Sequence, residues 1–105
     1  MLVVFDKEYL KSLYEKGSCD DRKHWFQPEI VSRYVRVIKL MCSVKDVSCL
    51  MNYNSLHYER LKGDKQGLSS VRINNKYRIE FEEWSEKGET VASICNIVDI
   101  SNHYN

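Results

Sequence analysis

The stretch VRINNKYRI, from Val71 to Ile79, decides the fold because it predicts a β-hairpin with a single favoured register. Asn74 and Asn75 tolerate the positive φ angles that hairpin turns require. A two-residue turn at this pair would mix apolar and charged side chains on one face of the hairpin. A three-residue loop that extends to Lys76 keeps the apolar and charged faces separate, and we therefore expect that loop.

The three-residue loop determines which residues stand opposite one another across the two strands. Val71 is expected opposite Ile79, on the face toward a core. Arg72 is expected opposite Arg78 on the other face. Like charges that are directly opposed across two strands destabilise a sheet by up to about 1 kcal/mol. The arginine pair therefore requires either compensation or a function.

Two explanations of the arginine pair remain open. Neighbouring carboxylates such as Glu80 and Glu82 could offset the repulsion, and flanking acids are common on a solvated strand face. Alternatively, the two cations hold an anion. In either case, the face that carries Arg72 and Arg78 is the candidate functional surface.

Length and composition indicate one globular domain. The chain has 105 residues, of which 43% are hydrophobic and 30% charged, and it contains a single proline. This composition argues against disorder or a repeat array. The length allows one hydrophobic core, so we expect a single domain over residues 1–105.

The first residues and the cysteines bear on localisation and on metal binding. The apolar run MLVVF lacks a basic region before it and stops at Asp6, so it indicates neither a signal peptide nor a membrane span. The four cysteines show no CxxC pair and no histidine spacing typical of zinc sites. We therefore expect a soluble, cytoplasmic protein that holds no metal ion.

The first half of the chain shows the apolar spacing of helices. The elements predicted there are a short strand over Leu2–Phe5, a helix over Lys7–Lys16, a second helix that begins at Pro28, and a turn near Val47–Met51. In the second helix Arg33, Arg36 and Lys39 lie off the apolar stripe. They suit a solvated face, although a long basic helix could also lie along nucleic acid.

The second half of the chain changes to an apolar period of two. The strands predicted there are Leu56–Leu61, Leu68–Ile73, Tyr77–Trp84 and Thr90–Ile100. Helices followed by a run of strands favour an α+β fold. We expect a short N-terminal strand and two helices that pack on a twisted, mainly antiparallel sheet.

The charges are unevenly distributed along the chain. The net charge is only +1, but residues 56–78 contain six Lys or Arg and two Asp or Glu, whereas residues 79–105 contain one and six. A local basic block indicates an anionic partner better than the total charge does.

Two histidines and three cations could together cleave RNA without a metal ion. They are His57, Lys62, Arg72, Arg78 and His103. One histidine would deprotonate the 2′-hydroxyl, another would protonate the leaving 5′-oxygen, and the cations would stabilise the charge on the phosphorane. This requires the C-terminus to fold back beside the central hairpin. For each histidine alone, a surface or strand-end position is an equally good explanation.

Several segments of the second half follow the order of a known pattern. They are Leu56-His57, Leu61-Lys62-Gly63-Asp64, Gly67, Ser70-Val71-Arg72-Ile73 and Tyr77-Arg78-Ile79. This series resembles the HigB-type branch of the RelE/ParE toxins, whose pattern is LH…LKGDxxGxxSxRIxxxYRI. The match is close over residues 56–81 and extends loosely to His103.

The resemblance implies a RelE-like fold and a ribosome-dependent, metal-independent mRNA endonuclease that inhibits translation and arrests growth. No cofactor is implied. The implied partners are a HigA-like helix-turn-helix antitoxin, the ribosome with its 16S rRNA, and mRNA. Operator DNA would be contacted only through the antitoxin, and no membrane is involved.

The resemblance also implies roles for individual residues. His57 matches the histidine before the LKG motif, and Lys62 matches the lysine of that motif. Arg72 and Arg78 match the strand cations near the scissile phosphate, and His103 matches the terminal histidine. We therefore expect His57, Arg78 and His103 to be catalytic, and Lys62, Arg72 and Arg78 to bind RNA phosphate.

The C-terminus departs from the family pattern. Many relatives end in Asp-Tyr-His, whereas this chain has Ser101-Asn102-His103-Tyr104. Tyr104 is expected to contact RNA, by stacking on a base or in the missing aromatic role. The departure leaves two alternatives open: a ParE-like gyrase-binding toxin without nuclease activity, and a non-catalytic module that binds an antitoxin or acts in regulation.

Overall fold

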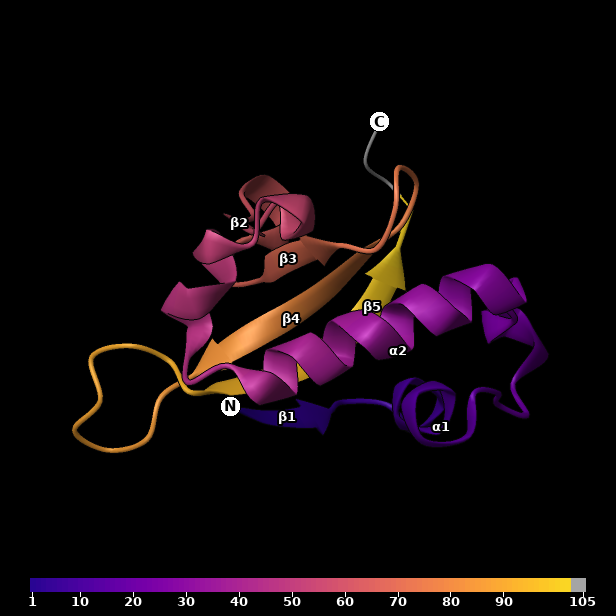
Figure 1. The fold of residues 1–105 in the computed structure, drawn as a ribbon, viewed down its shortest axis with the longest axis horizontal. Helices are drawn as coiled ribbons and strands as arrows, with labels where there is room; N and C mark the ends of the chain where they lie inside the picture. The colour runs from indigo at the N-terminus through magenta and orange to yellow at the C-terminus, as the bar shows by residue number, and fades with distance from the viewer. Residues whose placement is uncertain (103–105) are drawn as a thin grey trace.

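A computed structural model describes residues 1–102 as a five-stranded sheet with two α-helices packed against it (Figure 1). The strands are β1 (Leu2–Phe5), β2 (Glu59–Arg60), β3 (Ser69–Arg72), β4 (Arg78–Trp84) and β5 (Ile94–Ser101). The helices are α1 (Glu8–Lys16) and α2 (Pro28–Ser43). Within the described residues, no helix has the length and hydrophobicity that a membrane crossing requires.

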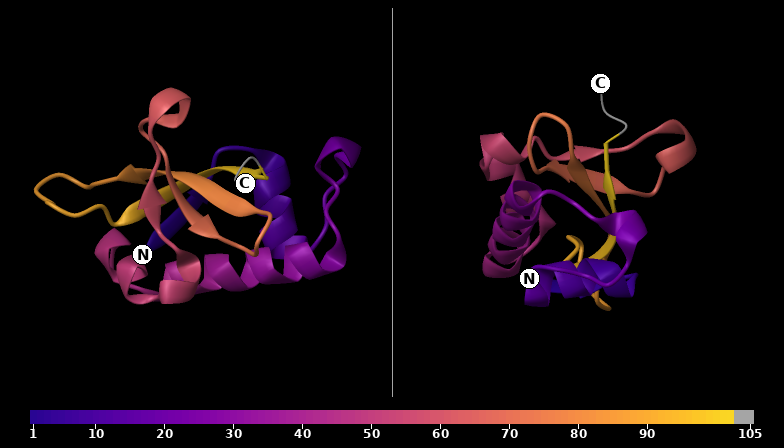
Figure 2. Two further views of the ribbon diagram at one scale, coloured as in Figure 1. Left: turned by 90° about the horizontal axis from the view of Figure 1, so that it is seen from above. Right: turned by 90° about the vertical axis from the view of Figure 1, so that its right-hand side faces the viewer.

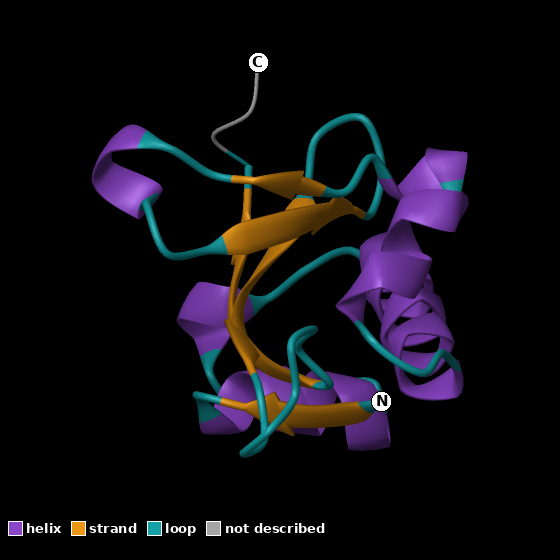
Figure 3. Cartoon of the chain, turned by 90° about the vertical axis from the view of Figure 1, so that its left-hand side faces the viewer, coloured by secondary structure: helices purple, strands orange, loops and turns teal. Residues whose placement is uncertain are grey.

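The strands lie in the spatial order β1-β5-β4-β3-β2. Only the β1–β5 pair of this sheet is parallel, among the strands that residues 1–102 form, and the other neighbours are antiparallel. Figure 3 shows the strong twist of the sheet. The α+β fold with a short N-terminal strand and a mainly antiparallel sheet is therefore confirmed.

The hydrophobic core lies between the two helices and the sheet, and α2 runs along the length of the sheet (Figure 2). Its fully buried large side chains are Leu10 of α1, Tyr34, Ile38 and Met41 of α2, Leu50, and Val71, Ile79, Phe81 and Ile97 of the sheet. The Tyr34 hydroxyl donates a hydrogen bond to the Leu10 carbonyl oxygen (2.8 Å), which joins the two helices inside the core. Gly17 ends α1 with a left-handed backbone (φ 74°), a conformation that glycine adopts without strain.

The predicted strand over Leu56–Leu61 is wrong in its first part. Leu56 ends a 3-10 helix, η3 (Asn54–Leu56), and β2 contains only Glu59–Arg60. The chain is not extended between them because His57 has a left-handed backbone, with φ 45° and ψ 51°. The other 3-10 helices of the described chain are η1 (Arg22–His24), η2 (Val47–Asn52) and η4 (Gly63–Lys65).

The last strand also begins later than predicted, at Ile94 rather than at Thr90. The Ser93 hydroxyl donates to the Glu89 carboxylate (2.7 Å), which ties this segment to the preceding loop. The Ala92 carbonyl accepts a hydrogen bond from η2 instead of from a strand. These contacts are not visible in the alternating sequence pattern.

The β3–β4 hairpin has the predicted register. Val71 stands opposite Ile79 and Arg72 opposite Arg78. The carboxamide oxygen of Asn74 accepts hydrogen bonds from the backbone N–H groups two and three residues later (2.9 and 2.8 Å). Such bonds from asparagine to the following backbone stabilise tight turns.

A β-bulge interrupts the pairing of β4 with β5. Glu80 stands opposite Asp99, but the next residue, Phe81, stands opposite Ile97. The bulge places Ile97 and Ile100 on the core side although they are three residues apart. Strict alternation cannot predict this, because a bulge adds one residue to one strand only.

Candidate functional site

The central hairpin forms one wall of a small pocket of about 280 Å³. Its lining residues are His57, Arg72, Asn74, Asn75 and Arg78. The structure thus brings together three residues that the sequence singles out, one from the segment after η3 and two from the facing strands. The pocket is polar and carries two guanidinium groups, so it can hold an anion such as a phosphate.

His57 lies between the two arginines. Its ring nitrogen Nε2 is 3.4 Å from Nη1 of Arg72, and its backbone carbonyl oxygen accepts a hydrogen bond from Nη2 of Arg78. A left-handed backbone is uncommon for residues other than glycine, although histidine adopts it more often than most of them. The bond from Arg78 helps to hold His57 in this conformation, with its side chain in the pocket.

The sequence suggests that Arg78 lies on a solvated strand face. In the structure, however, Arg78 is only 9% exposed. Its Nε donates to the Ser70 hydroxyl (2.8 Å), and its Nη2 lies 3.8 Å from the Glu59 carboxylate. The neighbouring strands β2 and β3 and the His57 backbone cover the guanidinium. The sequence does not predict this burial, because arginine side chains are mostly exposed in proteins.

Glu80 and Glu82, the two carboxylates expected to offset the repulsion of the arginine pair, contact other residues. Glu80 forms an ion pair with Lys65, and Glu82 accepts a hydrogen bond from the Asn96 amide (2.8 Å). Arg78 forms an ion pair with Glu59, whose side chain is 53% exposed. Hydrogen bonds to Ser70 and His57 together with Glu59 therefore offset the opposed charges.

Arg72 is the more accessible cation of the pair. Its guanidinium contacts the Asn75 side-chain oxygen and the His57 ring. The Arg72 side chain is partly exposed, and neither of these two contacts is to a carboxylate. Arg72 can therefore bind an incoming anion by exchanging weak contacts.

Lys62 is exposed and does not line this pocket. The lysine of the same segment that reaches the sheet is Lys65, which also donates to the Ser101 hydroxyl (3.3 Å). The loop with η4 projects from the sheet on the side away from α2 (Figure 2). The role of Lys62 in phosphate binding remains a prediction.

The predicted residues His103 and Tyr104 lie outside the described residues. The strand that precedes them does return to the central hairpin, because Ser101 stands opposite Arg78. The proposed chemistry requires the C-terminal strand to lie beside the hairpin. The described part of the chain has this arrangement up to Ser101.

Sequence reasoning missed three residues around the pocket. Ser70 and Glu59 contact Arg78, and Asn75 contacts Arg72. Ser70 carries a signal, because it belongs to the motif segment Ser70-Val71-Arg72-Ile73 and stands opposite Glu80 on the same face as the arginines. Glu59 shows no such signal, since its position depends on how β2 pairs with β3.

Tyr58 follows His57 but belongs to a separate network. Its hydroxyl donates to the Glu83 carboxylate, to which the Ser69 hydroxyl also donates. Burial raises the pKa of Tyr58, and the bond to Glu83 raises it further. Tyr58 therefore stays protonated and stabilises the sheet.

Two solved toxin structures have a similar fold. The chain matches the YoeB/ParE toxin from Agrobacterium tumefaciens with a TM-score of 0.58 and 17% identity, over 99% of this chain and all of that one. It matches the YoeB–YefM complex from Staphylococcus aureus with a TM-score of 0.57 and 18% identity, over 99% of each chain. The sheet order and helices therefore define a fold of the YoeB/ParE toxin class.

The sequence comparisons are more specific. Residues 3–100 match the family described as RelE-like toxin of type II toxin-antitoxin system HigB. Toxin HigB-1 of Vibrio cholerae serotype O1 is 26% identical over 83 residues, which are 78% of this chain and 83% of that toxin. The chain belongs to the HigB-like toxin family, within the RelE/ParE superfamily.

Proposed function

We propose that this HigB-like toxin is a ribosome-dependent endonuclease that cleaves mRNA without a metal ion and thereby inhibits translation. The observation that carries the proposal is the pocket in which the His57 imidazole lies 3.4 Å from the Arg72 guanidinium and beside Arg78. An acid or base next to fixed cations is the arrangement that phosphodiester transfer requires.

The proposed reaction is an attack of the RNA on its own backbone. The 2′-oxygen forms a bond to phosphorus, the bond from phosphorus to the 5′-oxygen breaks, and the products end in a 2′,3′-cyclic phosphate and a 5′-hydroxyl. His57 and His103 are the proposed acid–base pair. Arg72 contacts the non-bridging oxygens, and Arg78 adds positive charge while it positions His57.

We further propose that a HigA-like antitoxin with a helix-turn-helix domain silences the toxin. The family consists of toxins of type II toxin-antitoxin systems, and one of the similar structures is a YoeB–YefM complex. If the proposal is right, a small helix-turn-helix protein encoded next to this gene restores growth when both are expressed. Failure of every neighbouring protein to do so would contradict this part.

The decisive experiment is to map mRNA 5′ ends after brief expression of the protein in growing cells. New ends inside translated regions, which disappear when translation initiation is blocked, are expected. Intact mRNA together with cleaved DNA–gyrase complexes would instead support the gyrase-binding alternative. The absence of any growth effect would support the non-catalytic module.

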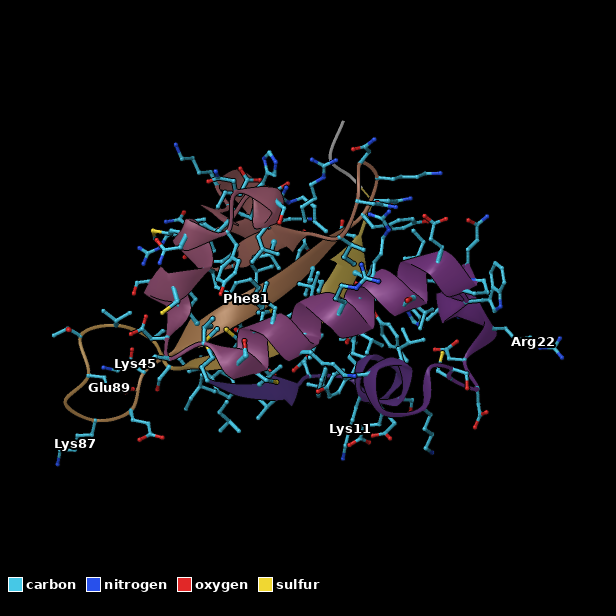
Figure 4. The ribbon with its side chains drawn as sticks, in the orientation of Figure 1. Lys11, Arg22, Lys45, Phe81, Lys87 and Glu89 are labelled. Atoms are coloured by element: carbon cyan, nitrogen blue, oxygen red, sulfur yellow. The ribbon has the colours of Figure 1, made fainter. Side chains whose placement is uncertain are left out.

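Arg72→Ala is expected to slow mRNA cleavage by about 10- to 100-fold while the protein stays folded. The reason is that one partly exposed cation at the reacting phosphate is lost, and no buried partner is left unpaired. The rate of cleavage in a translation extract provides the measurement. Lys87→Ala removes one charge from the distant β4–β5 loop (Figure 4) and is the control, for which no change is expected.

His57→Gly is expected to separate stability from activity. Glycine adopts φ 45° without strain, so the free energy of unfolding should stay the same or rise by up to about 1 kcal/mol. Growth arrest should nevertheless be lost, because the imidazole is removed. Urea denaturation and growth after induction measure the two effects. A His57→Gly protein that still arrests growth would exclude His57 from catalysis.

A further inference from the structure

A second groove lies next to the pocket, between α2 and the β3–β4 hairpin. Its volume is about 400 Å³. The lining residues are Arg33, Arg36 and Val37 of α2, Ser55 and Leu56 of η3, and Arg72, Ile73 and Asn74 of the hairpin. Nothing in the proposed cleavage step uses the two arginines of α2.

The groove is continuous with the pocket. Arg72 and Asn74 line both, so a chain that leaves the pocket enters the groove directly. Asn74 also lines a third hollow that includes Trp25, whose side chain is 70% exposed. Exposed aromatic rings beside a basic groove are typical of surfaces on which bases of a single strand stack.

The walls of the groove suit a nucleotide. Val37, Leu56 and Ile73, which are largely buried, form the apolar part of the lining, and Arg33 and Arg36 line the same groove. The two arginines are three residues apart on α2, which places them on the same side of the helix. Apolar surface with cations at its edge can hold a sugar and base together with the attached phosphate.

The arginines of the groove are not committed to strong partners. Arg33 is 3.6 Å from Glu29, but both side chains are largely exposed, and such surface pairs contribute little to stability. Arg36 is exposed as well. Lys39, the next cation of α2, is exposed but does not line the groove.

We propose that this groove is a second RNA subsite, in which Arg33 and Arg36 hold a phosphate of the substrate strand next to the phosphate that reacts in the pocket. The inference rests on the proposed nuclease function and adds the path of the strand. The groove orients the RNA on the toxin, whereas the pocket carries out the chemistry.

The test compares two probes that cannot be cleaved, a 2′-O-methyl dinucleotide and a 2′-O-methyl hexanucleotide. The Arg33→Ala/Arg36→Ala variant is expected to bind the hexanucleotide about tenfold more weakly at low salt. The slope of log affinity against log salt should fall by about 0.7, because the two arginines hold one phosphate and each phosphate contact of a single strand contributes about 0.7. The dinucleotide, which is long enough only for the pocket, should bind with unchanged affinity.

Two variants serve as matched controls. Lys39→Ala removes a cation from the same helix outside the groove, and Lys87→Ala removes one from the distant loop (Figure 4). Neither should change the salt slope. Thermal unfolding of all variants should coincide, since the altered side chains are exposed.

Four results would overturn the inference. An unchanged affinity of the double variant for the hexanucleotide overturns the subsite and leaves the nuclease proposal intact if mRNA is still cleaved. If the double variant binds both probes equally more weakly, the effect of the substitutions is not confined to the groove. Loss of antitoxin binding with full hexanucleotide binding assigns the groove to a protein partner. Failure of the unaltered protein to bind the hexanucleotide also overturns the subsite, whereas the nuclease proposal is tested separately by the mapped mRNA 5′ ends.

Discussion

Arg78→Ala is expected to abolish growth arrest and to lower the free energy of unfolding by about 2–4 kcal/mol. Arg78 is only 9% exposed, and its guanidinium donates to the Ser70 hydroxyl and to the His57 carbonyl oxygen. Its removal leaves these acceptors without their donor in a largely buried place, and each such loss costs about 1–3 kcal/mol. It also releases the backbone of His57. Urea denaturation and growth after induction measure both effects.

The Arg78 result needs a control that distinguishes instability from lost chemistry. Arg72→Ala removes the opposed cation but no buried hydrogen bond, so it should reduce cleavage with less than about 1 kcal/mol of lost stability. Arg78→Lys retains the charge and can replace one of the two hydrogen bonds. Its ammonium group cannot reproduce the planar geometry with which the guanidinium makes both, so the variant should have an intermediate free energy of unfolding. An Arg78→Ala protein as stable as the unaltered one would contradict the positioning role.

Phe81→Ala is expected to have the largest effect on stability, about 3–5 kcal/mol. Phe81 is fully buried in the middle of β4 (Figure 4), and it stands opposite Ser69 and Ile97 on the two neighbouring strands. Truncation leaves a cavity that the sheet and helices cannot fill. Because small domains are stable by only about 5–15 kcal/mol, a substantial fraction of the protein should be unfolded or degraded in cells.

The control for Phe81 is a change that keeps apolar volume. Phe81→Leu should cost clearly less than Phe81→Ala, because most of the buried surface is retained. Chemical denaturation followed by circular dichroism gives the three free energies. Equal costs for the two variants would show that packing at this position is not the source of the stability.

The opposed arginines of the hairpin show how a local cost is offset by tertiary contacts. The register that places Arg72 against Arg78 follows from parity along the strands and is confirmed. The compensation comes from Ser70, His57 and Glu59, which approach Arg78 from β3, the segment after η3, and β2. The two guanidiniums therefore have different environments, one largely buried and one accessible.

The amino-acid sequence by itself determined the elements whose signals are local. Periods of 3.6 and of two predicted α2 and the strands β3 and β4, and the Asn74-Asn75 turn with its flanking alternation predicted the hairpin register. The ordered motif from Leu56 to Ile79 predicted the family. These features depend on neighbouring residues or on the order of residues along the chain, so a single sequence contains them.

Only the tertiary structure decided which residues meet in the pocket and the groove. The burial of Arg78, the left-handed backbone of His57 and the bulge between Glu80 and Phe81 all arise from contacts between distant segments. Lys65 rather than Lys62 reaches the sheet for the same reason. Such contacts are determined by how strands pair and how α2 packs across them, which local periodicity does not encode.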